Sequence, residues 1–388
     1  MKQPMAIFPL LLALPLLHCD SAQGPVPTRF GVRDPYDRQG NWYRSNFHVH
    51  TSHSDGALNG EELVRLYEDA GYGALCITDH NQYGDQDGGV LTEFQEDSTL
   101  HDWNGDGILH ASHVLGSGVE AYVRDWRNPQ PSWARDRWVQ PALAPGGHQI
   151  VLLSGAETSQ GGNHIGLIGC PPGWVESPQQ GTEFLQRTSK AGGFVYLAHP
   201  GPLNENPEAA QEALSLGDFH GIEIMNGLWL TKNGPADATP LWDKLLARGV
   251  RLWGLANDDA HHEIGSSEAY PFTAFNMVLT EDLSPRGVLE ALHAGAFYAS
   301  TGLFFEQLEL QDKRLVVHVP GAERLRFIGR RGSALLEVAA SSATYDIGGL
   351  EGYVRVEAEA APVAEGTLRR CAWSQPYFIV GAAGAGAP

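Results

Sequence analysis

Short apolar runs that each end in a histidine, aspartate or glutamate constrain this fold more than any other feature of the chain. The first run, residues 41–47, leads directly into His48-Val49-His50. Residues i and i+2 of a strand point to the same side, so both imidazoles can reach one metal ion. Further runs of this kind occupy residues 74–78, 150–154, 194–198 and 251–256. Because side chains at the carboxyl ends of parallel strands converge on one mouth in an α/β barrel, we expect a single shared site.

The residues that end these runs are metal donors. For any one histidine, a surface or hydrogen-bonded core position is the plainer interpretation, but repeated endings of the same chemistry favour a metal site. Imidazole and carboxylate donors without thiolate suit zinc, manganese or iron. The endings, in chain order, are His48 and His50, Asp79 and His80, Glu157, His164, His199, and Asp259 and His261.

Taken in order, these motifs resemble the polymerase and histidinol phosphatase (PHP) superfamily of metal-dependent hydrolases. Residues 48–56 resemble its first motif and residues 78–81 its second, and the similarity extends over residues 43–300. The β-rich tail, with Trp373-Ser374-Gln375 near its end, is most similar to the carbaryl-hydrolase-like branch. The resemblance implies an α/β fold, a distorted (βα)7 barrel with a long insertion, followed by a small all-β domain.

The resemblance also implies a ligand set. One ion would lie among the paired histidines, the glutamate and the last aspartate; the glutamate would bridge to a second ion. Trinuclear members carry a histidine where this chain has Gly56. The number of divalent ions, two or three, therefore stays open. If a third ion binds, Asp55 is the donor near its position. The nine ligands carried over are His48, His50, Asp55, His80, Glu157, His164, His199, Asp259 and His261.

Residues beside the ligands receive other interpretations. His53 and His262 neighbour ligands and are expected to point away, whereas Asp258 is expected to support a ligand. Asp79 is expected to orient a ligand or carry a proton, and it joins Glu157 and Asp259 as a catalytic residue. Candidates for binding an anionic group are Arg124, Arg127, Arg135 and Arg137, whose plainer interpretation is exposed surface.

Three functions fit these residues. Metal ions lower the pKa of bound water towards about 7, which supplies a hydroxide nucleophile without a protein nucleophile. The first function is a phosphoesterase acting on a small phosphate ester or, as a 5′–3′ exonuclease, on a short oligonucleotide. The second is a metallohydrolase of carbamates, esters or amides. The third is a non-catalytic metal-binding lipoprotein.

The charge of the chain bears on its partners. Its 388 residues carry a net charge of −20, and no basic stripe interleaved with aromatic residues is visible. An acidic surface repels long polyanions, so we expect a small-molecule substrate and no extended nucleic-acid partner.

The start of the chain indicates export. Lys2 precedes an apolar stretch at residues 6–17, which is too short to span a bilayer as a mature helix. The sequence ending in His18-Cys19 resembles a bacterial lipobox, which predicts a signal peptide over 1–19 and a lipid anchor on Cys19 in the cell envelope. Plain secretion or a periplasmic location is the alternative. The remaining cysteines are three and widely spaced, and they form no disulfide framework.

The rest of the chain divides into segments. A tether is expected over 20–42, the metallohydrolase barrel over 43–302, an insertion over 82–148, a β-sandwich-like domain over 303–381 and a disordered tail over 382–388. Within the insertion, residues 102–107 resemble half of a calcium loop, but an Asx-rich turn explains them as well. Helices are predicted over 59–70, from Thr239 as cap to Gly249, and from Ser284 to about Gly295, with weaker ones at 182–191 and 205–214.

Overall fold

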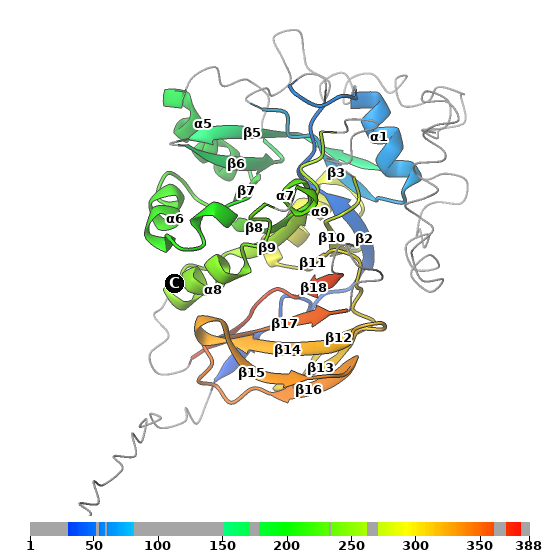
Figure 1. The fold of residues 1–388 in the computed structure, drawn as a ribbon, viewed down its shortest axis with the longest axis vertical. Helices are drawn as coiled ribbons and strands as arrows, with labels where there is room; N and C mark the ends of the chain where they lie inside the picture. Colours follow the sequence, from blue (N-terminus) through cyan, green and yellow to red (C-terminus); the bar gives the residue numbers. More distant parts are fainter. Residues whose placement is uncertain are drawn as a thin grey trace, which may run out of the picture.

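A computed structural model describes residues 30–51, 54–58, 60–80, 150–160, 162–170, 178–232, 234–261, 271–360 and 370–381. They form a mixed α/β part and, beneath it in Figure 1, a β-rich C-terminal part. The expected leader at 1–19, the insertion at 82–148 with its calcium-like loop at 102–107, and the tail at 382–388 lie outside these ranges. In the described part of the chain, no helix combines the length and apolar character that crossing a membrane requires.

The largest sheet runs from the α/β part into the C-terminal part. Its strands β2, β3 and β4 pair in parallel, and the pairs on the other side of β2 are antiparallel. In sheet order the strands are β1 (Gly31–Arg33), β19 (Tyr377–Val380), β17 (Tyr353–Glu359), β18 (Cys371–Trp373), β11 (Phe297–Ser300), β10 (Phe275–Thr280), β2 (Asn41–Asn46), β3 (Ala74–Cys76) and β4 (Val151–Leu153), with β14 (Arg324–Gly329) on β17 and β15 (Ser333–Val338) on β14.

A second sheet of the α/β part is mixed. β7, β8 and β9 pair in parallel, whereas β5, β6 and β7 pair antiparallel. β5 and β6 are joined by a two-residue link in which Gly162 has φ +82°, and so short a link can join only antiparallel strands. The strands in order are β5 (Gly155–Gln160), β6 (Asn163–Ile168), β7 (Phe194–Leu197), β8 (Gly221–Asn226) and β9 (Trp253–Asn257).

The two sheets meet at the ends of their strands. Only Ser154 separates β4 from β5. Beyond β3, His80 forms a parallel bridge with Glu157, and beyond β2, Val49 forms one with Ala260. These bridges hold the residue after β3 against Glu157 of β5, and the residues after β2 against those after β9. The mixed α/β fold matches our expectation, whereas the (βα)7 barrel stays a prediction.

The helices confirm most of the sequence prediction. Ser284 Oγ accepts a hydrogen bond from Gly287 N at 3.1 Å, and Gly295 ends the same helix with φ +77°. Thr239 is not a cap: it lies inside its helix, and Asp237 Oδ1 accepts from Thr239 N at 2.8 Å. The helices are α1 (Gly60–Asp69), α5 (Pro178–Lys190), α6 (Pro207–Leu214), α7 (Gly227–Thr231), α8 (Thr239–Ala247) and α9 (Pro285–Ala294), with 3-10 turns η2 (Gly201–Leu203) and η3 (Arg330–Gly332).

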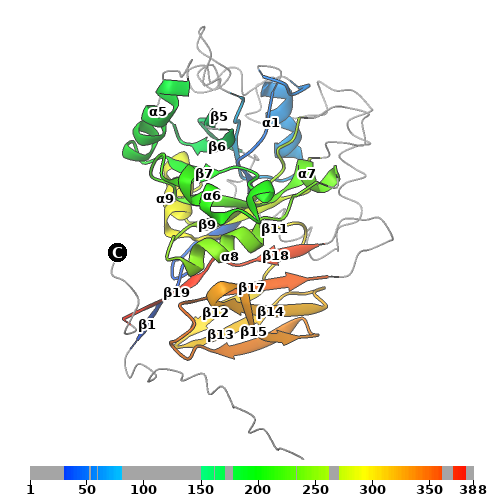
Figure 2. The ribbon, with the colours of Figure 1, turned by 60° about the vertical axis from the view of Figure 1, so that its left-hand side comes forward.

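The C-terminal part is β-rich, as expected. A three-stranded antiparallel sheet joins β12 (Gln307–Gln311), β13 (Arg314–His318) and β16 (Ser342–Asp346), and it lies beside β14 and β15. β18 pairs with β11 and β1 pairs with β19, so hydrogen bonds cross from this part into the α/β part. Figure 2 shows α8 directly above β17. The boundary of a separate domain at residue 303 remains a prediction.

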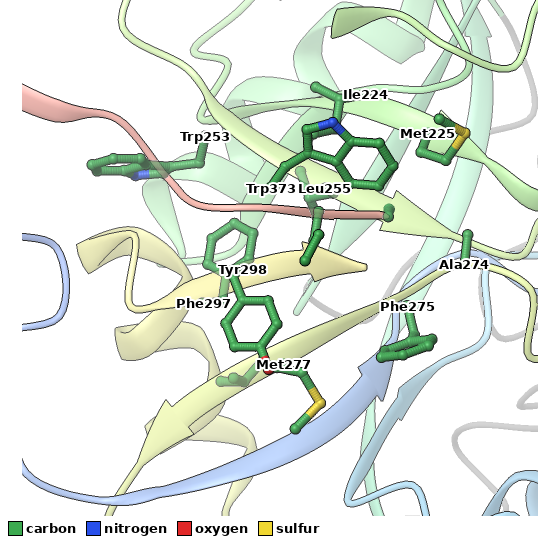
Figure 3. Packing of buried hydrophobic residues seen from close by; sticks show 14 of the residues in the cluster. Ile224, Met225, Trp253, Leu255, Ala274, Phe275, Met277, Phe297, Tyr298 and Trp373 are labelled. Carbon is green, nitrogen blue, oxygen red and sulfur yellow. The ribbon is translucent and has the colours of Figure 1, made fainter. Parts of the chain in front are cut away.

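One hydrophobic core serves both parts. Trp373 of β18 and Leu255 of β9 belong to the same buried cluster, and Figure 3 shows them among the side chains of Phe297 and Tyr298. Gln375 accepts a hydrogen bond from Gly254 N at 2.8 Å and donates one to Gly254 O at 2.7 Å. The residues after β18 therefore fasten the C-terminal part to β9, the strand that leads into the candidate site.

Candidate metal centre

His48 and His50 follow β2, and their side chains point to the same side as the i, i+2 spacing predicts. His48 Nε2 lies 3.3 Å and His50 Nε2 lies 3.1 Å from Asp259 Oδ1. Val49, between them, is fully buried in the hydrophobic core. Asp259 reaches this position because its backbone N–H donates to His48 O at 2.8 Å, which holds the end of β9 against the end of β2.

Glu157 lies at the middle of the cluster. Its Oε1 is 2.9 Å from His164 Nδ1 and 3.0 Å from His199 Nε2. Its Oε2 is 3.3 Å from His48 Nε2 and 2.9 Å from His80 Nδ1. The side chain is fully buried on β5. One carboxylate thus faces histidines from four different segments, an arrangement in which each oxygen can serve a different ion.

Asp55 forms the open side of the cluster. Its Oδ2 is 3.5 Å from His80 Nε2, and its Oδ1 is 3.3 Å from His261 Nε2 and 3.8 Å from His50 Nδ1. The Asp55 side chain is 54% exposed, whereas His50 is fully buried. One carboxylate and three imidazoles are enough donors for a third ion. The extra histidine that trinuclear members carry at the position of Gly56 is therefore not required.

All nine predicted ligands are brought together. They form overlapping groups in which the donor atoms lie within 4.8 Å of one another. Their assignment as ligands remains a prediction. The groups are His48, His50 and Asp259; His48, Glu157 and His199; His80, Glu157 and His164; and His50, Asp55, His80 and His261.

The geometry fits divalent transition metals. Metal–nitrogen bonds of about 2.0 Å in a tetrahedron place neighbouring donors about 3.3 Å apart, close to the separations around His48. Three buried atoms of the cluster, His48 Nε2, His50 Nδ1 and Glu157 Oε2, make no well-aligned hydrogen bond within the described residues, although His80 Nδ1 lies 2.9 Å from Glu157 Oε2. Buried polar atoms are rarely left unpaired, so their convergence indicates a ligand that binds all of them.

The electrostatics of the cluster favour cations. Burial lowers the pKa of His48, but Asp259 and Glu157 outweigh it, so this pKa lies well above its usual value. Burial raises the pKa of Glu157, but His48 and hydrogen bonds from His164 and His199 lower it well below its usual range. The carboxylate therefore stays ionised in the absence of metal and draws positive charge to itself, which divalent ions can supply in place of protons.

Within the described residues, the Asp79 carboxylate accepts hydrogen bonds from the turn that follows His50. Oδ1 accepts hydrogen bonds from Thr51 N at 2.7 Å and from Ser54 Oγ at 2.6 Å, and Oδ2 accepts from Thr51 Oγ1 at 2.6 Å. Its backbone oxygen accepts from Glu157 N at 3.2 Å. In these contacts Asp79 fixes the turn that carries Asp55, rather than a histidine ring.

Asp258 reaches the ligands only indirectly, through Asn46, whose Oδ1 accepts a hydrogen bond from His48 N. Its oxygens accept hydrogen bonds from Asn46 Nδ2 at 2.8 Å, Tyr67 Oη at 2.7 Å and Thr273 N at 2.7 Å. Within the part of the chain that the structure describes, none of its side-chain hydrogen bonds is with a predicted ligand. The carboxylate thus holds the segment after residue 271 against the end of β2. His53, His262 and the arginines at 124, 127, 135 and 137 lie outside the described residues.

Sequence reasoning missed a further buried carboxylate, Glu223 of β8. Its Oε1 lies 3.1 Å from His48 Nδ1 and accepts from Asn257 Nδ2 at 2.8 Å. Its Oε2 accepts from His199 N at 2.8 Å and from Asn226 Nδ2 at 2.9 Å. The sequence does contain a sign of this residue, since Glu223 is the one charged residue in the apolar run at 221–226. A fully buried glutamate needs specific partners, so a charge in such a run indicates a special role.

Imidazole and carboxylate donors that converge at strand ends of an α/β fold form a site that can hold divalent metal ions. Residues 46–187 match the family model of the PHP domain, and the chain therefore contains a PHP domain over these residues. The match covers less than half of the chain and ends before His199, Asp259 and His261, which the fold adds to the cluster.

Two solved structures of low identity are similar to the chain. One is a two-domain protein from Bacteroides vulgatus that contains a predicted PHP-like metal-dependent phosphoesterase, with 15% identity, 91% of each chain covered and a TM-score of 0.40. The other is an amidohydrolase from Chromobacterium violaceum with bound sulfate and no metal, with 15% identity, 58% of this chain and 89% of that chain covered, and a TM-score of 0.33. A search of curated proteins found no match.

Proposed function

We propose that the protein is a metal-dependent phosphoesterase that acts on a small phosphate ester. The observation that carries this proposal is the position of Glu157, whose two oxygens face different groups of histidines. A carboxylate in this position can bridge two ions. Such ions activate water and hold both the attacking and the leaving oxygen of a phosphoryl group when they are bound.

The residues of the chain supply the frame for this chemistry. Asp259 presents Oδ1 to His48 and His50, while its Oδ2 accepts a hydrogen bond from Asn226 Nδ2 at 3.1 Å. Asp259 is thus held by its far oxygen, while its near oxygen faces the two histidines. Asp55, His164 and His80 are the most exposed of the predicted ligands, so a substrate would enter on their side. We propose a distorted (βα)7 barrel as the frame of this site.

The alternative is a metallohydrolase of carbamates, esters or amides, since the same donors can activate water towards a carbonyl group. Purified protein reconstituted with Zn²⁺ or Mn²⁺ should hydrolyse bis-p-nitrophenyl phosphate faster than 1-naphthyl acetate. Faster hydrolysis of the ester would favour the alternative. Failure to hydrolyse either substrate with the metals bound would favour a non-catalytic metal-binding protein. The chelated protein and the Asp259→Asn variant serve as controls for contaminating hydrolases.

We also propose that the mature protein is exported and held to the cell envelope by lipid on Cys19. The apolar stretch before Cys19 is the sequence feature that supports this. A diacyl group with an added acyl chain anchors a protein stably, because each buried CH₂ contributes about 0.8 kcal/mol. Cys19→Ser should move the protein from the membrane fraction to the soluble fraction and leave its hydrolytic rate unchanged. A soluble wild-type protein with a different N-terminus would replace this proposal with plain secretion.

A further inference from the structure

We propose that Glu223 is a positioning residue that sets the tautomer of His48 and holds three predicted metal ligands in register. This inference rests on the proposed metal-dependent function, and it concerns a residue that would not touch the metal itself. Glu223 is fully buried, and its four contacts are with His48, His199, Asn226 and Asn257. A buried carboxylate is costly unless hydrogen bonds satisfy it, and here every partner leads to the candidate site.

The contact with His48 decides which ring nitrogen carries the proton. Glu223 Oε1 can only accept a hydrogen bond, so at 3.1 Å it keeps the proton on His48 Nδ1. When His48 is neutral, as a metal ligand must be, its lone pair is then on Nε2, the buried atom that lies 3.3 Å from both Glu157 Oε2 and Asp259 Oδ1. An outer carboxylate that fixes the tautomer of a histidine in this way orients it for metal binding.

The second oxygen of Glu223 holds a strained backbone. His199 has φ +27°, in the region that side chains other than glycine rarely adopt, and its N–H donates to Glu223 Oε2. This bond directs His199 towards Glu157 Oε1, 3.0 Å away. Without an acceptor at this point, the backbone would relax and the imidazole would move out of the cluster.

Asn226 extends the same network to a third ligand. Its Nδ2 donates both to Glu223 Oε2 and to Asp259 Oδ2, at 2.9 and 3.1 Å. Asp259 also has a positive φ, +51°. Glu223 therefore connects ligands that follow β2, β7 and β9, three strands that lie apart in the sequence. A carboxylate with these contacts positions several predicted ligands at once, so its loss would disturb all of them together.

The test is the near-isosteric change Glu223→Gln. Each oxygen of Glu223 faces two nitrogens, so an amide NH₂ at either position would meet donors or force the proton of His48 onto Nε2. We expect the affinity for Zn²⁺, measured by competition with a chromophoric chelator, to fall about 10- to 100-fold. We also expect the visible absorption spectrum of the Co²⁺-substituted protein to change. Wild-type affinity together with an unchanged Co²⁺ spectrum would overturn the proposal.

The matched control is Glu357→Gln, which changes a buried carboxylate of β17 that contacts Arg355 and Arg326 instead of the ligands. It should reduce stability and leave Zn²⁺ affinity and the Co²⁺ spectrum unchanged. An equal loss of affinity in both variants would reduce Glu223 to a structural residue and overturn the inference.

A measurement on the wild type covers the case in which Glu223→Gln fails to fold. In zinc-loaded protein with ¹⁵N-labelled histidine, His48 should carry its proton on Nδ1, with its resonances assigned by their loss in His48→Gln. A proton on Nε2 would refute the inference while leaving the metal site in place. A wild type that binds no Zn²⁺ or Co²⁺ would instead refute the proposed function.

Discussion

Arg355 of β17 donates to both carboxylate oxygens of Asp243 on α8, from Nε at 2.9 Å and from Nη2 at 2.6 Å. Both residues are buried, and Tyr353 Oη donates to the same carboxylate at 2.7 Å. The Arg355 guanidinium also lies 5.1 Å from the ring centre of Trp242. The α/β part and the C-terminal part are thus joined by a charge pair that is removed from water.

Breaking that pair should destabilise the protein strongly. In Arg355→Met, the Asp243 carboxylate would remain buried without its cation, which typically costs about 3–5 kcal/mol. Chemical denaturation of the two proteins would measure this as a difference in the free energy of unfolding. Arg286→Met, which removes an exposed pair with Glu290, is the control and should produce no measurable change. A small effect of Arg355→Met would mean that the shared hydrophobic core, and not this ion pair, stabilises the contact between the α/β part and the C-terminal part.

Metal content should be at least two transition-metal ions per chain. The donor groups around His48, around Glu157 and around Asp55 share residues, but together they offer more ligands than one coordination sphere can use. Elemental analysis of protein produced with ample metal would give this number. One ion or none would contradict the prediction.

Removal of the metal should also lower the melting temperature. A ligand that binds only the folded state adds about 2.7 kcal/mol of stability at a free concentration 100-fold above its Kd. Dialysis against a chelator, followed by thermal unfolding with and without added Zn²⁺, would measure the loss and its recovery. Unchanged melting in the presence of metal would indicate that the cluster is stable without it.

Asp259→Asn should lower turnover without unfolding the protein. The change keeps the size of the side chain but removes the charge that faces His48 and His50. We expect a fall of about 100-fold or more, because changes even outside the ligand shell typically cost 10- to 100-fold. His50→Ala should act in the same direction. Kinetics, metal content and circular dichroism together separate loss of metal from loss of fold.

The matched control for that experiment is Asp346→Asn, on the exposed surface of β16. It should leave both turnover and metal content unchanged. If Asp259→Asn and His50→Ala gave unfolded protein rather than metal-depleted protein, the predicted role of these residues would be wrong.

His220 should make stability depend on pH. Burial and the neighbouring His293 lower the pKa of His220 to about 4, and the ring accepts a hydrogen bond from Val195 N at 3.0 Å. An unfolded histidine has a pKa of about 6.5, so between pH 6.5 and 4 the unfolded chain binds a proton that the folded chain does not. Stability should therefore fall as the pH drops through this range.

The free energy of unfolding, measured from pH 7 to pH 4 in wild type and in His220→Asn, tests this directly. The wild-type curve should fall more steeply than that of the variant, since the other titrating groups are common to both. Parallel curves would show that His220 titrates normally in the folded protein.

The local features of the fold were predictable from the sequence. The helix at 285–294 was expected because Ser284, Pro285 and Gly295 mark its ends, and the structure confirms the cap and the left-handed residue. Most of the donors are predictable because they follow short apolar runs, whereas His164 begins one and Asp55 lies in a turn. The antiparallel pairing of β5 with β6 was not expected, although the link at Gly161-Gly162 is too short for a crossover.

Contacts between distant residues were not predictable in the same way. Asp79 and Asp258 stand beside ligands in the sequence, yet their carboxylates hold backbone segments. Glu223 looks like one charged residue in an apolar strand, and 175 residues separate it from His48. Neither periodicity nor composition indicates which ring nitrogen a buried carboxylate will face.

The sequence by itself determined which residues can bind metal and where the strands that carry them end, because donor chemistry and hydrophobic periodicity are local properties. The tertiary structure alone decided which donors share one ion-sized space, which carboxylate lies at the centre and which lies behind His48. Strand order, the bridges between strand ends and side-chain packing set those distances, and each depends on segments far apart in the chain.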